Sequence, residues 1–271
     1  MIRVELMKML RRPRTWVAIA MLNALPTLVA ILVSLTDIAP APGEGPPFLS
    51  AVLTDATLFP LVALGIVLPL FLPIAVAVVG GEAIASEAQN GTLRYLLVRP
   101  VSRGYLIVAK LVSGVVFVLL TVVLVAAVGY VVGQIFLGQG TAPTGVASIS
   151  GTTLSGAEVA QRTALALGYI TLSMLGVAAL ALLLSTLTDS AIGAALGTVG
   201  FLIASTVLLG LDAAQALHPW LPTRYWLAFV DLFRDPILWD DVTLGVLLQG
   251  AYFLVFSVAA WANFATKDIT S

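Results

Sequence analysis

Residues 105–136 read YLIVAKLVSGVVFVLLTVVLVAAVGYVVGQIF, and Lys110 is the only charged residue among them. An α-helix rises about 1.5 Å per residue, so roughly 20 apolar residues cross a hydrocarbon core of about 30 Å with every backbone polar group paired inside the segment. This stretch exceeds that length. The sequence therefore predicts a membrane-spanning helix here, with extra turns that tilt or project beyond the bilayer.

Five other stretches meet the same criterion, namely residues 16–35, 58–81, 163–187, 191–211 and 243–263. The composition agrees with this prediction: 60% of the residues are hydrophobic, 10% are charged, and the mean hydropathy is +1.07. A chain of 271 residues with this composition has more apolar side chains than one water-soluble core could bury. The net charge of −1 gives no reason to expect nucleic acid as a partner. We predict an all-α integral membrane protein, with six transmembrane helices in a single transmembrane domain over residues 1–271.

The connections between these stretches differ in character. Residues 36–57 and 139–161 are rich in Pro, Gly, Ser or Thr and read as exposed loops. The link at residues 188–190 is so short that the helices on either side must form an antiparallel hairpin. Residues 212–242 carry interspersed aromatic and charged side chains, which predicts short interfacial or re-entrant helices before the last span.

The basic residues are unevenly distributed over the two sides. Five precede the first span, four lie between the second span and the first turns of the third, and one follows the sixth, against three on the opposite side. By the positive-inside rule both termini and residues 82–103 are cytoplasmic in a multi-pass protein of the cell (plasma or inner) membrane. A cleavable signal peptide ending near Ala39-Pro40-Ala41 is the alternative, which the roughly 20-residue apolar run disfavours because signal peptides carry 7 to 15.

The segment between the second and third spans is the most informative for function. Gly91 after Asn90 terminates a helix, and Pro100 forces a second break, which leaves residues 92–98 as a short piece at the membrane surface. Such a piece suits the docking of a soluble partner. The alternative is a juxtamembrane loop whose arginines touch anionic lipid.

The N-terminal residues 1–14 have an amphipathic pattern. Val4, Met7 and Leu10 recur about every three residues, so this segment can lie flat on an anionic leaflet, with Pro13 separating it from the first span. The polar residues that we expect on this interfacial helix are Glu5, Lys8, Arg11 and Arg12. A tail that only sets the topology is the alternative.

Residues 87–97, followed by Arg99-Pro100-Val101-Ser102-Arg103, resemble the first cytoplasmic loop of type-2 ABC transporter permeases, and residues 5–16 and 264–269 are similar to that family's two ends. The resemblance implies a permease subunit of an exporter that dimerises with a second copy or a homologous permease and pairs with two ATP-binding subunits. ATP and Mg would be bound by those partners, and this chain would hold no cofactor. The positions that the resemblance assigns to coupling are Glu82, Glu87, Gly91, Thr92, Arg94 and Tyr95.

Enzymatic alternatives are weaker. The nearest approach to a phosphate-binding G-x-x-x-x-G-K-[S/T] loop, residues 151–156, is followed by Ala157 in place of lysine. Glu82 and Glu87 could act as general acid and base and Ser86 as a nucleophile, but no histidine or second base lies nearby in the sequence to support catalysis. His218 beside Pro219 reads as a turn residue rather than a metal ligand. We therefore expect that the chain itself is not an enzyme.

Within the spans, few features point to a substrate pathway. Gly193, Gly197 and Gly200 form a small-residue pattern for close helix packing, either inside the subunit or between two copies. We expect Lys110 to snorkel to the cytoplasmic surface, and the lack of other ionisable groups disfavours an ion-coupled carrier. A non-transport membrane scaffold or assembly factor is the alternative class of function, and an ion-coupled carrier is the third.

Overall fold

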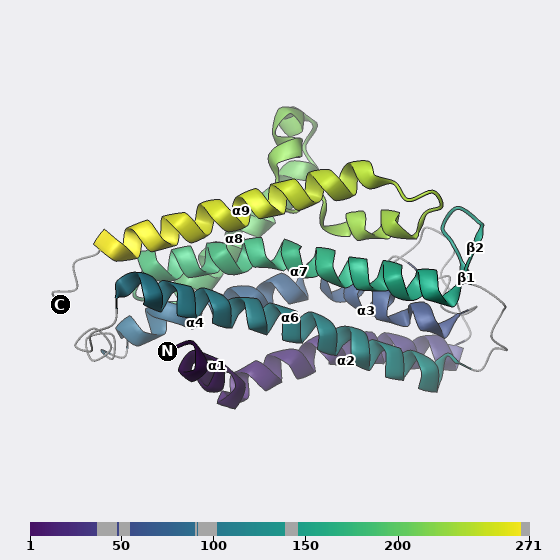
Figure 1. The fold of residues 1–271 in the computed structure, drawn as a ribbon, viewed down its shortest axis with the longest axis horizontal. Helices are drawn as coiled ribbons and strands as arrows, with labels where there is room; N and C mark the ends of the chain where they lie inside the picture. Colours follow the sequence, from purple (N-terminus) through teal and green to yellow (C-terminus); the bar gives the residue numbers. More distant parts are fainter. Residues whose placement is uncertain (37–47, 49–54, 90, 92–101, 139–145, 267–271) are drawn as a thin grey trace.

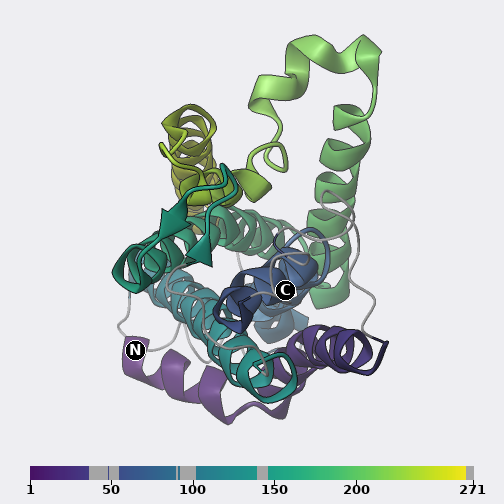
Figure 2. The same cartoon turned by 90° about the vertical axis from the view of Figure 1, so that its right-hand side faces the viewer.

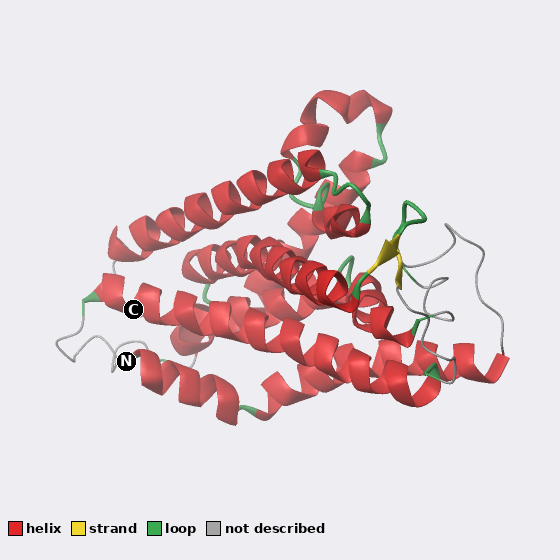
Figure 3. Ribbon diagram, turned by 45° about the vertical axis from the view of Figure 1, so that its right-hand side comes forward, coloured by secondary structure: helices red, strands yellow, loops and turns green. Residues whose placement is uncertain are grey.

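The computed structural model describes residues 1–36, 48, 55–89, 91, 102–138 and 146–266, and these are almost entirely helical (Figure 3). Six of the described helices are long and apolar enough to cross a membrane: α2 (Pro13–Thr36), α4 (Phe71–Gln89), α6 (Arg103–Phe136), α7 (Gly156–Leu187), α8 (Ala191–Leu209) and α9 (Trp239–Thr266). The predicted all-α architecture with six candidate spans is therefore confirmed. Most of the loop predicted at residues 36–57 lies outside the described residues.

The N-terminal segment forms a separate helix, α1 (Ile2–Arg11), as predicted. Arg12 has extended backbone angles, φ −75° and ψ 124°, because the residue before a proline avoids the helical region. Pro13 then begins α2, where its missing N–H costs nothing. The hydroxyl of Thr15 donates to the Met9 carbonyl over 2.8 Å and closes the corner between the two helices.

The second span is not the continuous helix that we predicted over residues 58–81. It consists of a 3-10 turn η1 (Ala56–Leu58), helix α3 (Phe59–Val67), a break at residues 68–70, and α4. Pro69 and Pro73 cause the break, because neither can donate a backbone N–H to the preceding turn. Helix α4 continues to Gln89, past the predicted end of the span, and Gly91 follows it with a positive φ of 66°.

The helices form an elongated bundle with α7 at its centre, in contact with α4, α6, α8 and α9 (Figure 1). Helix α1 and the C-terminal end of α9 lie at one end of the bundle, which we call the α1 end. The opposite end, which we call the hairpin end, carries the two-stranded sheet of β1 (Val146–Ala147) and β2 (Thr153–Leu154). Helices α7 and α8 are antiparallel, as the short link between them predicted.

Two 3-10 helices, η2 (Asp212–Trp220) and η3 (Trp226–Phe233), connect α8 to α9, as the aromatic pattern of residues 212–242 predicted. Viewed down the bundle, η2 forms an arch on the side opposite α1 and α2 (Figure 2). The buried Arg162 of α7 donates to the carbonyls of Leu232 and Arg234 over 3.2 and 2.7 Å. The Tyr169 hydroxyl donates to the Tyr225 carbonyl over 2.6 Å, so hydrogen bonds from α7 fix this connection.

Helix α7 begins seven residues earlier than its predicted span. Ser155 caps its N-terminus and forms a reciprocal capping box with Glu158, which stabilises the first turn outside the apolar stretch. His218 lies with Nε2 3.0 Å from the Leu208 carbonyl at the end of α8, in agreement with a role in the turn.

Candidate functional site

The candidate site is a cluster of charged side chains at the α1 end, where α1 crosses the ends of α4 and α6. Lys110, in the third turn of α6, is only 6% exposed. Its ammonium lies 2.8 Å from Glu5 Oε2 on α1 and 2.5 Å from Glu87 Oε1 on α4. Lys8 Nζ lies 2.6 Å from the same Glu87 oxygen. We call these four residues the buried ion-pair chain; its three central members are buried, and the Lys8 side chain at its end is 37% exposed.

The buried ion-pair chain alternates in sign along Glu5, Lys110, Glu87 and Lys8, so its formal charges sum to zero. Glu5 and Glu87 are 7% and 3% exposed, and burial of such groups is tolerated when they are paired. Removing Lys110 leaves two buried carboxylates without the cation that they share, which is strongly destabilising. The chain therefore ties three helices, α1, α4 and α6, to one another.

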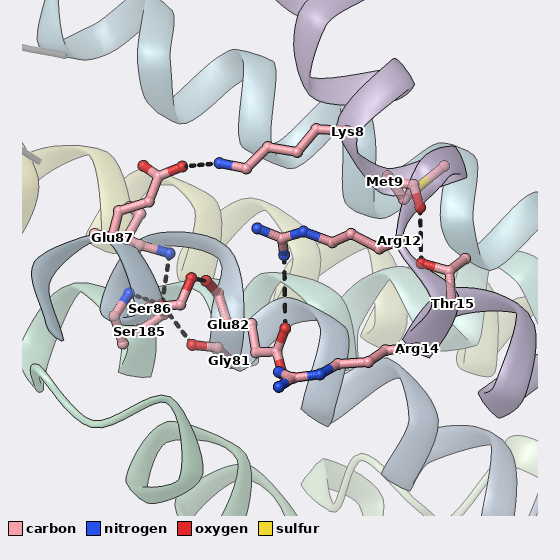
Figure 4. A network of polar contacts seen from close by, with 12 residues as sticks. Lys8, Met9, Arg12, Arg14, Thr15, Gly81, Glu82, Ser86, Glu87 and Ser185 are labelled. Carbon is pink, nitrogen blue, oxygen red and sulfur yellow. Dashed lines mark hydrogen bonds and ion pairs between the residues drawn. The ribbon is translucent and has the colours of Figure 1, made fainter. Parts of the chain in front are cut away.

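A second, more exposed group of charges lies at the corner between α1 and α2. Arg12 and Arg14 converge on the carboxylate of Glu82, over 3.6 and 2.8 Å (Figure 4). The side chain of Arg14 is 80% exposed, so water and salt screen its pair with Glu82. We therefore expect these ion pairs to orient the start of α2 and to contribute little to the stability of the fold.

The end of α4 that carries Glu82 and Glu87 is itself held firmly by α7. The hydroxyl of Ser185 donates to the Gly81 carbonyl over 2.8 Å and accepts from the N–H groups of Ile84 and Ala85 (Figure 4). A side chain cannot be added at Gly81 without movement, because a Cβ there would come within 2.9 Å of the Ala195 nitrogen on α8. Both glutamates thus project from a rigid segment.

A cavity of about 80 Å³ lies between α1 and the helices that it crosses. Its polar wall includes Lys8, Arg12 and Lys110, and its apolar wall includes Val79 and Leu182. Within the described residues, no group of three His, Asp or Glu side chains could hold a metal ion. The carboxylates of this region already have lysine or arginine partners, so the geometry suits mechanical linkage of helices.

The structure brings together four of the predicted site residues, Glu5, Lys8, Glu82 and Glu87, although they were assigned to two different roles. Arg12 joins them through Glu82, whereas Arg11 is exposed on α1. Gly91 lies in an exposed turn, and the predicted coupling residues Thr92, Arg94 and Tyr95 lie outside the described residues. Glu87 is 3% exposed and paired with Lys8 and Lys110, and its role in coupling to a partner stays a prediction.

Lys110 is the residue whose surroundings the sequence analysis misjudged. The expectation that it snorkels to the surface is wrong, because its ammonium is buried between two carboxylates. A signal was present in the sequence: a lysine inside an apolar span needs a partner, and Glu5 and Glu87 lie in the two segments expected near its end of the span.

The predicted small-residue pattern on α8 has a mixed outcome. Gly193, Gly197 and Gly200 are exposed, whereas Ala194, Ala195 and Thr198 form the buried face. A Cβ on Gly197 would come within 3.1 Å of Leu184 on α7, and one at Gly200 would meet open space. Close packing of α8 against α4 depends on Gly81 of α4, and a contact of the α8 glycines with a second copy stays a prediction.

These features define the class: a multi-pass α-helical membrane protein whose N-terminal helix is tied to its bundle by buried ion pairs. Residues 28–270 match a family described as a protein of unknown function, DUF2705. Since the match covers most of the sequence, the chain belongs to this family. No curated protein matches the chain.

Proposed function

We propose that this chain is the permease subunit of an ATP-binding cassette exporter. It would dimerise with a second copy or a homologous permease, form the translocation pathway, and associate with two separate ATP-binding subunits. The α1 end would face the cytoplasm of a cell bounded by the plasma or inner membrane, as the distribution of basic residues indicates.

One observation carries the proposal. Helices α4 and α6 flank the segment that resembles the coupling loop, and Glu87 and Lys110 connect both helices to α1 through direct ion pairs. A partner that pushes on the loop would therefore move α1, α4 and α6 together. ATP binding by the partner would in this way reach helices that run the length of the bundle.

The proposal divides the predicted coupling residues by role. Glu82 and Glu87 position helices inside the chain, since both have basic partners there. Direct contact with the ATP-binding subunit is expected from Gly91, Thr92, Arg94 and Tyr95. Reversing the charge of Arg94 should therefore weaken the complex with the ATP-binding subunit without disturbing the fold of this chain.

The test is purification of tagged full-length chain from its native host in mild detergent. We expect an ATP-binding subunit to co-purify with the wild type, and Arg94→Glu to reduce its recovery at least tenfold. Asp212→Lys reverses a charge on η2, on the side of the bundle opposite α1 and α2, and serves as the control. If wild type retains no such subunit under conditions that preserve the folded chain, the scaffold hypothesis replaces the transporter.

The buried ion-pair chain also favours a second candidate, an ion-coupled carrier, because ionisable groups inside membrane proteins often belong to ion pathways. Two features count against it. The cluster lies at one end of α4 and α6 instead of at their middle, and its charges are mutually compensated. Transport that follows an imposed proton gradient without ATP would favour the carrier.

A further inference from the structure

The cavity of about 80 Å³ at the α1 end has an exposed rim formed by the start of α2 and the second half of α4. Arg14 on α2 and Val78 on α4 both line the cavity, and they are 80% and 42% exposed. Both helices are long and apolar enough to span a membrane. The cavity is therefore accessible from the bilayer that surrounds these helices.

The depth of the cavity corresponds to the headgroup region of a membrane. Arg12 and Arg14 flank Pro13, the first residue of α2, so they lie where a candidate membrane span begins. Trp16, about one turn further along α2, is 48% exposed, and tryptophan side chains favour the interface between water and hydrocarbon. A phospholipid has its phosphate at this level.

The two arginines at the cavity have guanidinium donors to spare. Arg12 Nη1 lies 3.6 Å from the Glu82 carboxylate, and within the described residues the Arg12 side chain donates no hydrogen bond. Arg14 donates to Glu82 through Nη1, over 2.8 Å. A guanidinium carries five N–H donors in a planar fork that matches two phosphate oxygens. Both side chains can thus bind a phosphate and keep their contacts with Glu82.

The charges around the cavity are not balanced. The four basic and two acidic side chains that line it are Lys8, Arg12, Arg14, Lys110, Glu5 and Glu82. A third carboxylate, that of Glu87, binds Lys8 and Lys110. Among the residues that the structure describes here, one positive charge is left over, and a phosphodiester with a charge of −1 would neutralise it.

The size and the remaining lining of the cavity also suit a lipid phosphate. A single water needs roughly 10–15 Å³ of such volume, so 80 Å³ holds a group of several heavy atoms. The apolar part of the lining includes Ala18, Val79 and Leu182. Basic pockets between transmembrane helices bind anionic headgroups in this way.

We propose that this cavity binds one anionic phospholipid, whose phosphate accepts hydrogen bonds from Arg12 and Arg14. Its glycerol and first acyl carbons contact the apolar lining, and its chains continue into the bilayer past Val78. The bound lipid would fasten the corner between α1 and α2 to α4. The proposal requires only that the α1 end lies at a membrane surface, so it is independent of an ATP-binding partner.

The test is native mass spectrometry of full-length chain in detergent with added phosphatidylglycerol, an anionic phosphodiester lipid. We expect one copy to bind more tightly than any further copy. Phosphatidylcholine with the same acyl chains should bind about tenfold more weakly, because its headgroup has no net charge. Arg12→Gln combined with Arg14→Gln should weaken binding of phosphatidylglycerol about tenfold, because the charge-assisted hydrogen bonds are lost.

Arg3→Gln combined with Arg11→Gln is the matched control, since both arginines are exposed on α1 and neither lines the cavity. This variant should change the affinity by less than about twofold. Equal losses in the two double variants would indicate general attraction to a basic surface and would overturn the proposal. Equal affinity of wild type for the two lipids would overturn it as well.

A third variant keeps every charge and changes only the space. Ser113→Leu adds bulk to the lining of the cavity and should also weaken binding of phosphatidylglycerol. Thermal unfolding without added lipid checks that each variant is folded. If the Arg12 and Arg14 variant does not fold, Ser113→Leu decides, and an unchanged affinity in it would contradict a site in this cavity.

A soluble competitor distinguishes a lipid from a free phosphate compound. Glycerophosphoglycerol has the same phosphodiester as phosphatidylglycerol but lacks the acyl chains. We expect it to compete only at concentrations at least about tenfold higher, because it has no apolar part to bury. Equal potency would mean that the cavity binds soluble phosphodiesters, and the assignment to a lipid would then be wrong.

Discussion

At the scale of single residues, Lys110 explains how a charge is accommodated inside an otherwise apolar helix. Its ammonium contacts carboxylates from two other helices, so three segments must come together before the charge is compensated. A buried pair of this kind adds little net stability compared with apolar packing, but breaking it is costly. The buried ion-pair chain therefore acts chiefly by specifying how α1 docks.

Lys110→Met should accordingly destabilise the protein strongly, by roughly 3–5 kcal/mol, because it leaves the carboxylates of Glu5 and Glu87 buried without their shared cation. Thermal unfolding in detergent, followed by tryptophan fluorescence, measures the loss. The triple variant Glu5→Gln, Glu87→Gln, Lys110→Met removes all three charges and should recover most of it. An unchanged Tm for the single variant would mean that the ion pairs do not hold α1.

The exposed charges at the corner between α1 and α2 provide a contrast. Arg14→Ala should cost less than about 1 kcal/mol, because its pair with Glu82 is screened by solvent. The same fluorescence assay at low and high salt checks this, and the small difference from wild type should shrink as salt rises. A loss as large as that of Lys110→Met would contradict the distinction between buried and exposed pairs.

At the scale of elements, the sequence predicted six long apolar helices because each carries its own hydropathy signal. It did not predict that the second of them is broken at residues 68–70, where α3 is separated from α4. Nor could it show that Gly81, rather than the glycines of α8, makes the close helix approach, since that depends on how the two helices face each other.

Gly81 and Gly200 therefore make a matched pair of substitutions. Gly81→Ala places a Cβ 2.9 Å from the Ala195 backbone nitrogen and should cost about 1–3 kcal/mol, because α4 and α8 must separate. Gly200→Ala meets open space and should be neutral or stabilising by up to about 1 kcal/mol through helix propensity. Thermal unfolding of both variants measures the change in Tm relative to wild type. An equal change in Tm for the two variants would contradict the close packing described for α4 and α8.

At the scale of the whole molecule, the candidate site could be predicted only in part. Glu5, Lys8, Glu82 and Glu87 were recognisable as polar residues at one end of the bundle from the distribution of charge. Their pairing was not, because Glu5 and Lys110 are 105 residues apart and only the packing of α1 on α6 brings them together. The role of Lys110 was misjudged for the same reason.

The orientation of the bundle yields a separate prediction. The chain contains no cysteine, so single cysteines can be introduced at Arg11, at the α1 end, and at Ala157, at the hairpin end. A membrane-impermeant maleimide should label Ala157→Cys in intact cells, and Arg11→Cys only after the membrane is permeabilised. The reverse pattern would place the α1 end outside and rule out docking of a cytoplasmic ATPase there.

The most direct test of the central claim, that this bundle works with an ATP-binding partner, is the rate of ATP hydrolysis by the chain purified from its native host. We predict that the wild-type preparation hydrolyses ATP and that the Arg94→Glu preparation loses this activity together with the partner. The same chain expressed in a host without that partner should show none. A wild-type native preparation that hydrolyses no more ATP than this partner-free chain would contradict the account.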